Sequence, residues 1–541
     1  MTRALARLVS GPVAVFAAGL LAAQGLPPVP FPTGNPPTVN KALLGKALFW
    51  DEQLSSSKTV ACGTCHLPSG GGSDPRTFAS PQESMHPGAD GLFGGPDDVG
   101  GSLGLPRIDP AGRYLGSVFG LGVQVGPRRS MSVVMAAYSP TLFWDGRAPS
   151  AFVDPVTNQV LLPASAALES QALLPFLNEV EMGHVGRTVT DLVDRVTNSV
   201  PLAMASNIPG PLAAFVAGRT YPQLFGLAFG TAVVTPARIA MAIATYEREL
   251  VPDRTPFDLG TLSPIARLGE QVFNGVGRCN VCHAPPLFTD HNFVNLGVRP
   301  IAEDLGRSIV TGLPADRGAF RMPSLRNVAL RGPFDHNGRL RTLDDVVAFY
   351  DRGGDFPPAT PAITPLFLGA QQKRDLIAFL VELTDPRVAQ GLPPFDRPTL
   401  WSESAFAPRT IGTASPGDGG ALPRAIAVEP AILGTSRWTL ALERATPGVP
   451  VWMLLSTGAD PIGLNVFGAQ LHVTPGPGLV GFVAGFTSGT TPGTGTLTLD
   501  LIVPADPSLH GLTMFGQWWV LNVAHQNPFS ATAAFSFSLM R

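Results

Sequence analysis

The feature that most constrains this chain is a short motif that occurs twice and uses all four of its cysteines. The motif is Cys-x-x-Cys-His, at residues 62–66 and again at residues 279–283. Two thiols three residues apart on one turn can each form a thioether with a haem vinyl group, and the histidine that follows can ligate the iron. We therefore predict two covalently bound c-type haems, attached and ligated by Cys62, Cys65 and His66 and by Cys279, Cys282 and His283.

Other uses of paired cysteines fit this chain less well. Histidine makes up 9 of 541 residues, so chance would place one directly after both pairs only about 3 times in 10,000. A zinc site built from two Cys-x-x-Cys pairs separates them by roughly 15–20 residues, far fewer than separate these two. Because every cysteine is committed to haem, we expect no disulfide bond.

The N-terminus has the pattern of a secretory signal. Arg3 and Arg7 precede an apolar stretch, residues 8–23, and a Pro-rich segment follows directly. This order favours a cleaved signal peptide over the alternative, a short membrane anchor. We predict a signal peptide over residues 1–24 and a periplasmic or exported protein, which agrees with the attachment of c-type haem outside the cytoplasm.

The sequence of the mature chain argues against a membrane span and against nucleic-acid binding. No later segment reaches the roughly 18 uninterrupted apolar residues of a membrane span, so we expect no such span. The formal charge is −3 and basic runs are lacking, which argues against nucleic-acid binding.

The pattern of apolar residues changes along the chain from helical spacing to alternation. Before residue 400, helical spacing predicts helices at 41–49, 211–216, 236–250, 342–350 and 370–383. Beyond Trp401, alternation predicts strands at 438–442, 497–501 and 535–539, separated by Gly/Pro turns. We therefore expect mainly α domains followed by an all-β sandwich, and the β domain has no clustered histidines or carboxylates that would suggest a second active site.

Residues 69–126 are dense in Gly, Pro and Asp, which predicts a long ordered loop or insertion. Asp90, Asp97 and Asp98 lie among its glycines and could offer oxygen ligands to calcium. Their spacing fits no EF-hand loop, so a solvated turn is the favoured interpretation.

From about Lys41 to Asp385 the chain resembles the bacterial dihaem cytochrome c peroxidases and their MauG-like relatives. The resemblance is carried by ordered motifs on both sides of the two haem sites: LGKALF (44–49), LFWDGRA (142–148), ESQA (169–172), VEMG (180–183), CHAPPLF (282–288), PSLRN (323–327), PFDHNG (333–338) and FYDRGG (349–354). It implies two mainly α cytochrome c-like haem domains. With the β region, the expected organisation is an N-terminal peroxidatic haem domain with a loop insertion (25–252), a C-terminal electron-transfer haem domain (253–392), a Pro/Gly-rich linker (393–424) and a β-sandwich accessory domain (425–541).

The same resemblance implies roles for several side chains. Gln171 and Glu181, ten residues apart, fall where the family keeps a glutamine and a catalytic glutamate beside the haem that meets peroxide. A carboxylate whose pKa is raised by an apolar pocket can shuttle the peroxide proton near neutral pH. Trp144 matches a tryptophan between the haems, although a lone aromatic is also an ordinary core residue. Arg326 and His336 lie in motifs that the family places against haem.

At the second haem the chain departs from the ordinary peroxidases. Those proteins carry a methionine ligand fourteen residues after the histidine that corresponds to His336, and here that position is Tyr350. A phenolate favours ferric and higher oxidation states, as in the MauG-like branch. The alternative is that Tyr350 only packs at a helix end and that Met322 ligates the iron.

Two further departures concern the first haem and the space between the haems. Leu121 stands where the peroxidases have a displaceable histidine, so we expect a first haem with an open face unless His86 folds back onto it. Arg129 and Arg331 stand at positions that contribute to the family's interhaem calcium site. Two guanidinium groups would repel a cation, so we do not expect calcium there.

The expected function is a dihaem c-type peroxidase that reduces hydrogen peroxide to water with electrons from a small redox protein, such as a cytochrome c or a copper protein. The alternatives are a MauG-type dihaem oxidase that modifies a partner protein, and a non-catalytic dihaem electron carrier. The retained pair of Gln171 and Glu181 argues against the carrier.

Overall fold

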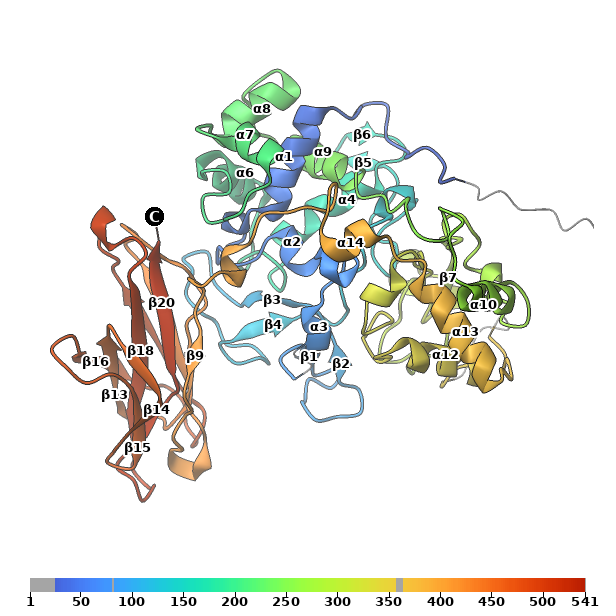
Figure 1. Ribbon diagram of the computed structural model, residues 1–541. Helices are drawn as coiled ribbons and strands as arrows, with labels where there is room; N and C mark the ends of the chain where they lie inside the picture. The colour runs from blue at the N-terminus through green and yellow to red at the C-terminus, as the bar shows by residue number, and fades with distance from the viewer. Residues whose placement is uncertain (1–24, 80–81, 357–362, 541) are drawn as a thin grey trace, which may run out of the picture.

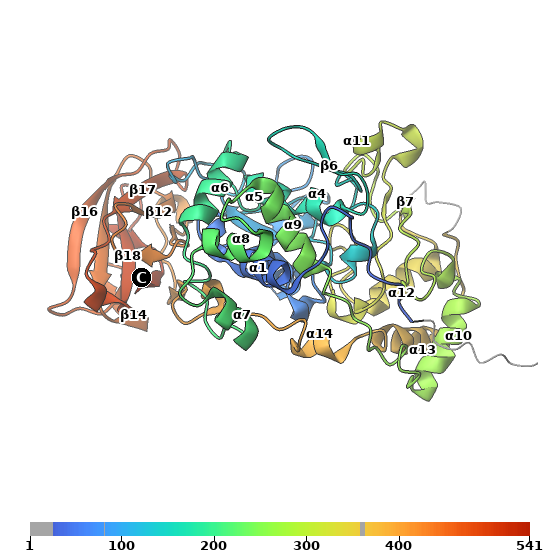
Figure 2. The same ribbon diagram turned by 90° about the horizontal axis from the view of Figure 1, so that it is seen from above.

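The computed structural model describes residues 25–79, 82–356 and 363–540. In this part of the chain the C-terminal sheets lie at one end of the molecule, a first helical region lies in the middle, and a second helical region lies at the opposite end (Figure 1, Figure 2). No described helix combines the length and the apolar character that crossing a membrane would need. The predicted signal peptide, residues 1–24, falls outside the described residues.

The first helical region is built around two packed helices, α1 (Val39–Trp50) and α9 (Pro236–Glu247). The helices approach so closely that a Cβ on Gly45 would lie 1.9 Å from the carbonyl oxygen of Ala242. Trp50 Nε1 donates a 3.0 Å hydrogen bond to the Tyr246 hydroxyl across the same contact. The other elements of this region are α2 (Cys62–Cys65), α4 (Ala167–Ala172), α5 (Leu174–Leu177), α6 (Val189–Asn198), α7 (Gly210–Val216) and α8 (Tyr221–Phe229), with the strand pair β5 (Phe152–Val153) and β6 (Val160–Leu162).

The second helical region repeats this packing. Helix α10 (Pro264–Asn274) precedes the second Cys-x-x-Cys-His motif as α1 precedes the first, and it packs on α13 (Ala370–Val381). A Cβ on Gly269 would lie 1.9 Å from the carbonyl oxygen of Asp375, so glycine is again required at the crossing. The remaining elements are α11 (Ser308–Thr311), α12 (Leu343–Arg352) and the strand pair β7 (Phe293–Val294) and β8 (Phe320–Arg321). Helix α14 (Pro386–Gln390) follows α13 in the chain, but its Val388 packs in the core of the first helical region.

The predicted loop 69–126 is ordered by short elements rather than by a large domain. It contains α3 (Arg76–Ala79) and two antiparallel pairs: β1 (Met85–His86) with β2 (Val99–Gly100), and β3 (Leu103–Pro106) with β4 (Val123–Val125). The aspartates of its turn accept backbone hydrogen bonds, such as those from Ala89 and Asp90 to Asp97 Oδ2 at 2.8 and 3.0 Å. These contacts agree with the interpretation of a turn.

The C-terminal region is all β. One sheet has the order β11-β20-β18-β13-β16, with β19 also paired to β18 and β9 to β20; a second has the order β10-β12-β17; β14 pairs with β15. The strands are β9 (Thr410–Ile411), β10 (Arg424–Ile426), β11 (Ala431–Ile432), β12 (Trp438–Ala445), β13 (Pro450–Ser456), β14 (Ala459–Val466), β15 (Ala469–Val473), β16 (Val480–Phe486), β17 (Gly495–Leu501), β18 (Thr513–Leu521), β19 (Phe529–Ala531) and β20 (Ala534–Met540). Strands β12, β17 and β20 cover the three alternating stretches.

The segment predicted to be a linker, residues 393–424, is more tightly integrated than a linker. Its strand β9 pairs with β20, and Leu400 and Trp401 are buried against the first helical region. The backbone N–H of Trp401 donates a 2.6 Å hydrogen bond to Glu52. The segment therefore ties the β region to the first helical region along its length.

Candidate active site

The first Cys-x-x-Cys-His motif forms the single-turn helix α2 and is followed by a tight loop that fixes its histidine. His66 Nδ1 lies 3.1 Å from the carbonyl oxygen of Gly72. A proton on Nδ1 makes this a hydrogen bond and leaves the lone pair of Nε2 for an iron. Burial lowers the pKa of His66, which favours the neutral imidazole that a metal needs.

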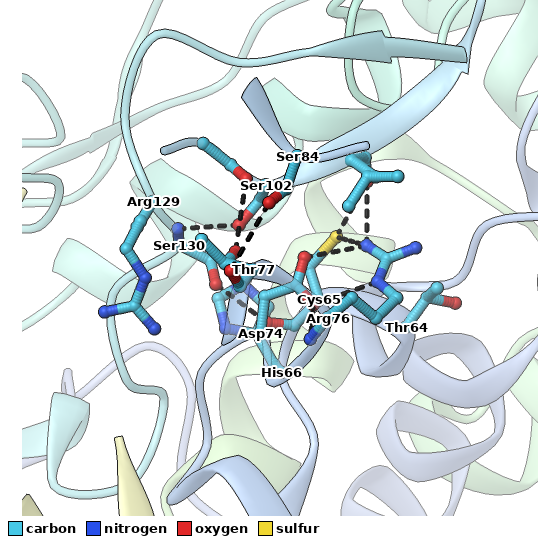
Figure 3. Close-up of polar contacts among 12 residues, drawn as sticks. Thr64, Cys65, His66, Asp74, Arg76, Thr77, Ser84, Ser102, Arg129 and Ser130 are labelled. Atoms are coloured by element: carbon cyan, nitrogen blue, oxygen red, sulfur yellow. Dashed lines mark hydrogen bonds and ion pairs between the residues drawn. The ribbon is translucent and has the colours of Figure 1, made fainter. Parts of the chain in front are cut away.

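Arg76 lies beside the first motif and is not among the predicted site residues. Its Nη2 lies 3.2 Å from Cys65 Sγ and 2.8 Å from the carbonyl oxygen of Leu103, and its Nε and Nη2 bind both oxygens of Asp74 (Figure 3). Arg76 thus orients the sulfur that would carry the thioether. No sequence motif pointed to it, because the loop has to fold back before Arg76 meets Cys65.

The structure brings Glu181 close to the first motif. Strand β3 lies between them: Leu103 contacts Cys65 through the Sγ···O distance of 3.6 Å, and Leu105 N–H donates to the carbonyl oxygen of Val180 at 3.1 Å. Asn178 orders the turn, since its Nδ2 donates to Glu181 Oε1 at 3.2 Å. Gln171 lies in α4 and is partly exposed.

The electrostatics of Glu181 match a group that exchanges protons. Burial raises the pKa of Glu181 above its ordinary value, and the guanidinium of Arg147 opposes this rise. Burial is the main cause that raises the pKa of Cys62 and of Cys65, and the negative charge of Glu181 adds to the rise at both thiols, which places the carboxylate within electrostatic reach of the attachment site. Without the resemblance to known proteins, residues 147 and 181 offer no sequence signal of this pairing.

The second motif begins with the 3₁₀ helix η4 (Cys279–Val281). His283 is buried, and its Nδ1 lies 3.0 Å from the carbonyl oxygen of Phe288. Both motif histidines therefore have the same second contact, a backbone carbonyl of the loop that follows. In each case the contact presents Nε2 to a metal.

A cavity of about 320 Å³ lies over the second motif, and it fits a large apolar cofactor that carries charged groups. Its wall includes Cys279, Cys282 and His283 together with apolar side chains such as Val328, Val347 and Leu376. It also holds buried arginine atoms without partners, Nε of Arg129, Arg321 and Arg331, among the described residues. Haem c matches this chemistry, with an apolar ring, two thioether bonds, an iron for His283 and carboxylates for the arginines.

Tyr350 and Met322 both line this cavity. Tyr350 lies on α12, and burial raises the pKa of its phenol, with Cys279 and Cys282 adding to the rise. A ferric iron would supply the positive charge that favours the phenolate. Met322 is buried, and its backbone carbonyl accepts a 2.6 Å hydrogen bond from the Thr289 hydroxyl.

Trp144 and His336 lie together at the other end of the cavity, with their ring centroids 6.2 Å apart. His336 stacks on Phe320 at 3.6 Å, and its Nδ1 lies 2.7 Å from Asp335. The guanidinium of Arg326 donates to Asp258 at 2.7 Å and to the carbonyl oxygen of Pro252 at 2.9 Å. These contacts already engage its donors in ordering the chain around the second motif.

The sequence raised two positions, His86 and Leu121, in connection with the open face of the first haem, and the structure gives contacts for both. His86 is half-buried and lies with Asp304, His336 and Asn337 around a separate cavity of about 80 Å³. Leu121 is buried, and its backbone N–H donates a 2.7 Å hydrogen bond to Glu443 of β12.

Comparison with known proteins identifies relatives over most of the chain. A family model described as di-haem cytochrome c peroxidase matches residues 39–261. The methylamine utilization protein MauG of Methylorubrum extorquens is 32% identical over 375 residues, which are 68% of this chain and 84% of the relative. Cytochrome-c peroxidase IdrP1 of Denitromonas iodatirespirans is 31% identical over 406 residues, 67% of this chain and 87% of the relative.

Among solved structures, a MauG-like protein associated with microbial copper homeostasis shares 25% identity and covers 70% of this chain and 98% of its own, with a TM-score of 0.48. The sequence matches to these two relatives cover two thirds of this chain and most of each relative's length. With two Cys-x-x-Cys-His motifs whose histidines have matching contacts, the chain belongs to the di-haem cytochrome c peroxidase family.

Proposed function

We propose that the protein is a periplasmic or exported dihaem peroxidase that reduces hydrogen peroxide with electrons from a small redox protein. The observation that carries this proposal is the half-buried carboxyl of Glu181, which strand β3 links to Cys65 of the first motif. Bound haem supplies a redox-active iron at each motif. Cys62, Cys65 and His66 would hold the first group, and Cys279, Cys282 and His283 the second, with Tyr350 as its distal ligand.

The chain's own residues handle the protons and orient the peroxide. Reduction of one peroxide to two waters consumes two electrons and two protons. Glu181 takes a proton from the near oxygen of peroxide and returns it to the leaving oxygen, and Gln171 orients the molecule through its side-chain amide. Because burial raises its pKa, Glu181 is a stronger base than an exposed carboxylate.

The second site receives and passes on the electrons. Trp144 and Tyr350 share the cavity wall with His283. An aromatic ring between two haem edges shortens each electron-transfer step, which is the role we propose for Trp144. The associated domain limits are 25–252 and 253–392 for the haem domains and 425–541 for a β-sandwich accessory domain.

The test is stopped-flow mixing of the holoprotein with peroxide for the wild type, Glu181→Gln and Glu179→Gln. Glu179 is the matched control, since its side chain is 44% exposed and pairs only loosely with Arg107, at 3.5 Å. We expect Glu181→Gln to slow peroxide reduction by about 10²–10⁴-fold, the range for loss of a general acid–base group. Unchanged turnover in Glu181→Gln would refute the assignment.

A MauG-type oxidase that modifies a partner protein is the second candidate. The 32% identity to a MauG protein and the tyrosine at position 350 favour it. Sustained turnover with a reduced cytochrome c or copper protein separates the two, because the peroxidase requires it and the oxidase does not. A non-catalytic electron carrier would instead have two six-coordinate haems and would not bind carbon monoxide when reduced.

A further inference from the structure

Three arginines that the proposed reaction does not use line the cavity of the second haem motif. Arg129 and Arg321 are only 5% and 6% exposed, and Arg331 lines the same cavity. In each, Nε is buried and has no hydrogen-bond partner in the described part of the chain. Buried donors without partners are rare in proteins, and each costs about 1–3 kcal/mol or more when it carries charge.

These guanidinium charges also lack carboxylate partners. None of the three forms an ion pair among the described residues, although the nearby Arg128 and Arg76 both do. Two carboxylates act on the charge of Arg129 without forming an ion pair with it: Asp74 pairs with Arg76, and Asp335 binds His336 through Oδ1 while its Oδ2 has no hydrogen-bond partner in the described chain. Three guanidinium charges outnumber the two nearby carboxylates, so an additional anion would stabilise the cluster.

The pair Arg129 and Arg331 lies between the two haem motifs. Arg129 Nη2 is 3.4 Å from Ser73 Oγ, directly after the Gly72 that binds His66. The side chain of Arg331 packs against Gly71, where a Cβ would lie 2.7 Å from its Cγ. The two residues thus reach the loop of the first motif from the cavity of the second.

The pair is held in place before any ligand arrives. Arg129 donates through its Nη1 to the carbonyl oxygen of Pro333, and Arg331 donates through its Nη2 to that of Ser324. Burial lowers the pKa of both residues to about 10, and the charge of Arg129 lowers that of Arg331 further, so the two guanidinium groups are close enough to repel each other. Fixed, repelling cations with free donors are suited to a shared anionic ligand.

We propose that Arg129 and Arg331 form a carboxylate-binding site for haem propionates between the two haems, and that they supply there the positive charge that a bound divalent cation would otherwise provide. Propionates are the anionic groups of a c-type haem, and a guanidinium binds a carboxylate with two hydrogen bonds. Arg321 adds a third positive charge at the same cavity. This proposal depends on haem attachment but not on the reaction with peroxide.

One consequence concerns calcium. Two guanidinium groups at this position exclude a divalent cation by repulsion. We expect the purified holoprotein to contain no stoichiometric calcium, and we expect treatment with EGTA to leave its absorption and EPR spectra unchanged. Stoichiometric calcium whose removal alters either spectrum would overturn the proposal.

A second measurement tests the propionate contact directly. Redox titration followed by absorbance gives the midpoint potential of each haem in Arg129→Gln, Arg331→Gln, the matched Lys variants and Arg374→Gln, a control on the outer helix α13. Loss of a positive charge beside a haem stabilises the oxidised form, so we expect a lower potential for at least one haem in both Gln variants and a smaller shift with Lys.

Potentials equal to the wild type in both Gln variants, with two haems counted by the pyridine haemochrome assay, would overturn the proposal. Because neither arm measures peroxide turnover, its failure is distinguishable from failure of the proposed function.

Discussion

Trp144 Nε1 donates a 2.8 Å hydrogen bond to the backbone carbonyl of Arg129. The backbone carbonyl of Trp144 in turn accepts a 2.9 Å hydrogen bond from the backbone N–H of Arg321. The tryptophan proposed to couple the haems is therefore held by the backbones of two of the buried arginines. Its orientation and the charge between the haems depend on the same short segments of chain.

Replacement of Trp144 tests this coupling. Trp144→Phe keeps an aromatic ring but removes the hydrogen bond to Arg129, at a cost of about 1 kcal/mol of stability. We expect slower redistribution of oxidising equivalents between the haems, and a further slowing in Trp144→Leu, measured by freeze-quench EPR after one equivalent of peroxide. Trp452→Phe in the β region is the control. Equal rates in the wild type and Trp144→Leu would assign Trp144 to packing alone.

The pH dependence of peroxide reduction should depend on Arg147. Its guanidinium opposes the rise that burial causes in the pKa of Glu181. The ionised carboxyl accepts the proton, so activity is present above this pKa and is lost as the pH falls through it. Arg147→Gln should raise the pKa and move the acid limb of the kcat/KM profile to higher pH, whereas Arg147→Lys should move it less. If the acid limb stays in place in Arg147→Gln, then Arg147 does not affect the pKa of the group that limits activity.

Local patterns predicted much of the fold, and contacts between distant segments account for what they missed. Helical spacing at 41–49 corresponds to α1 (Val39–Trp50), and alternation at 535–539 corresponds to β20 (Ala534–Met540). Arg76 meets Cys65 only because the intervening loop folds back, so no local signal marked it. Residues 393–424 were predicted to be a linker because they are rich in Pro and Gly. That composition gives no sign that a few large side chains, such as Trp401, are buried.

At the candidate site, too, local patterns predicted some residues, whereas residues distant in the chain could not be predicted from local patterns. The two Cys-x-x-Cys-His motifs identify the haem sites without reference to any other protein, because their chemistry is contained in five consecutive residues. Glu181 lies more than 100 residues and Tyr350 more than 60 residues along the chain from the nearer cysteine pair, and both were predicted only through resemblance. Arg326 was likewise placed only through resemblance, and in the structure its donors bind Asp258 and backbone carbonyls.

The ligand of the second haem can be assigned by two substitutions. Tyr350 and Met322 both line the cavity, so either could reach the iron. If Tyr350 is the ligand, Tyr350→Phe should change the EPR and absorption signals of one haem, and Met322→Leu should leave them as in the wild type. The opposite result would assign Met322 and would remove one argument for the MauG-like branch.

The β region should restrain the loop that passes the first haem. Glu443 is 4% exposed, accepts the 2.7 Å hydrogen bond from Leu121 N–H and forms an ion pair with Arg424 at 2.6 Å. Glu443→Gln weakens a charge-assisted hydrogen bond and should cost about 1–2 kcal/mol locally. We expect faster hydrogen–deuterium exchange at residues 115–125. Arg444→Gln, whose side chain is 61% exposed and 3.8 Å from Glu443, is the control. Unchanged exchange in Glu443→Gln would show that the loop is held by the helical region alone.

Glu247, at the end of α9, should make the stability of the protein depend on pH. Its side chain is 3% exposed, and its Oε2 has no hydrogen-bond partner in the described chain. Burial raises the pKa from 4.5 to about 8; the adjacent Arg248 opposes the rise and Glu169 adds to it. Arg248 cannot fully compensate, because it forms a bidentate pair with Glu169 at 2.8 Å.

The sign of this dependence follows from proton linkage. Between pH 4.5 and about 8 the unfolded carboxyl is ionised while the folded one keeps its proton, so unfolding releases a proton. Stability is therefore fully present below pH 4.5 and falls as the pH rises, by at most about 1.4 kcal/mol per unit. Glu247→Gln removes this loss, so thermal unfolding of the holoprotein should show the variant more stable than the wild type at pH 8, with the difference vanishing near pH 4.5. A difference that does not change with pH would mean that folding does not raise the pKa of Glu247.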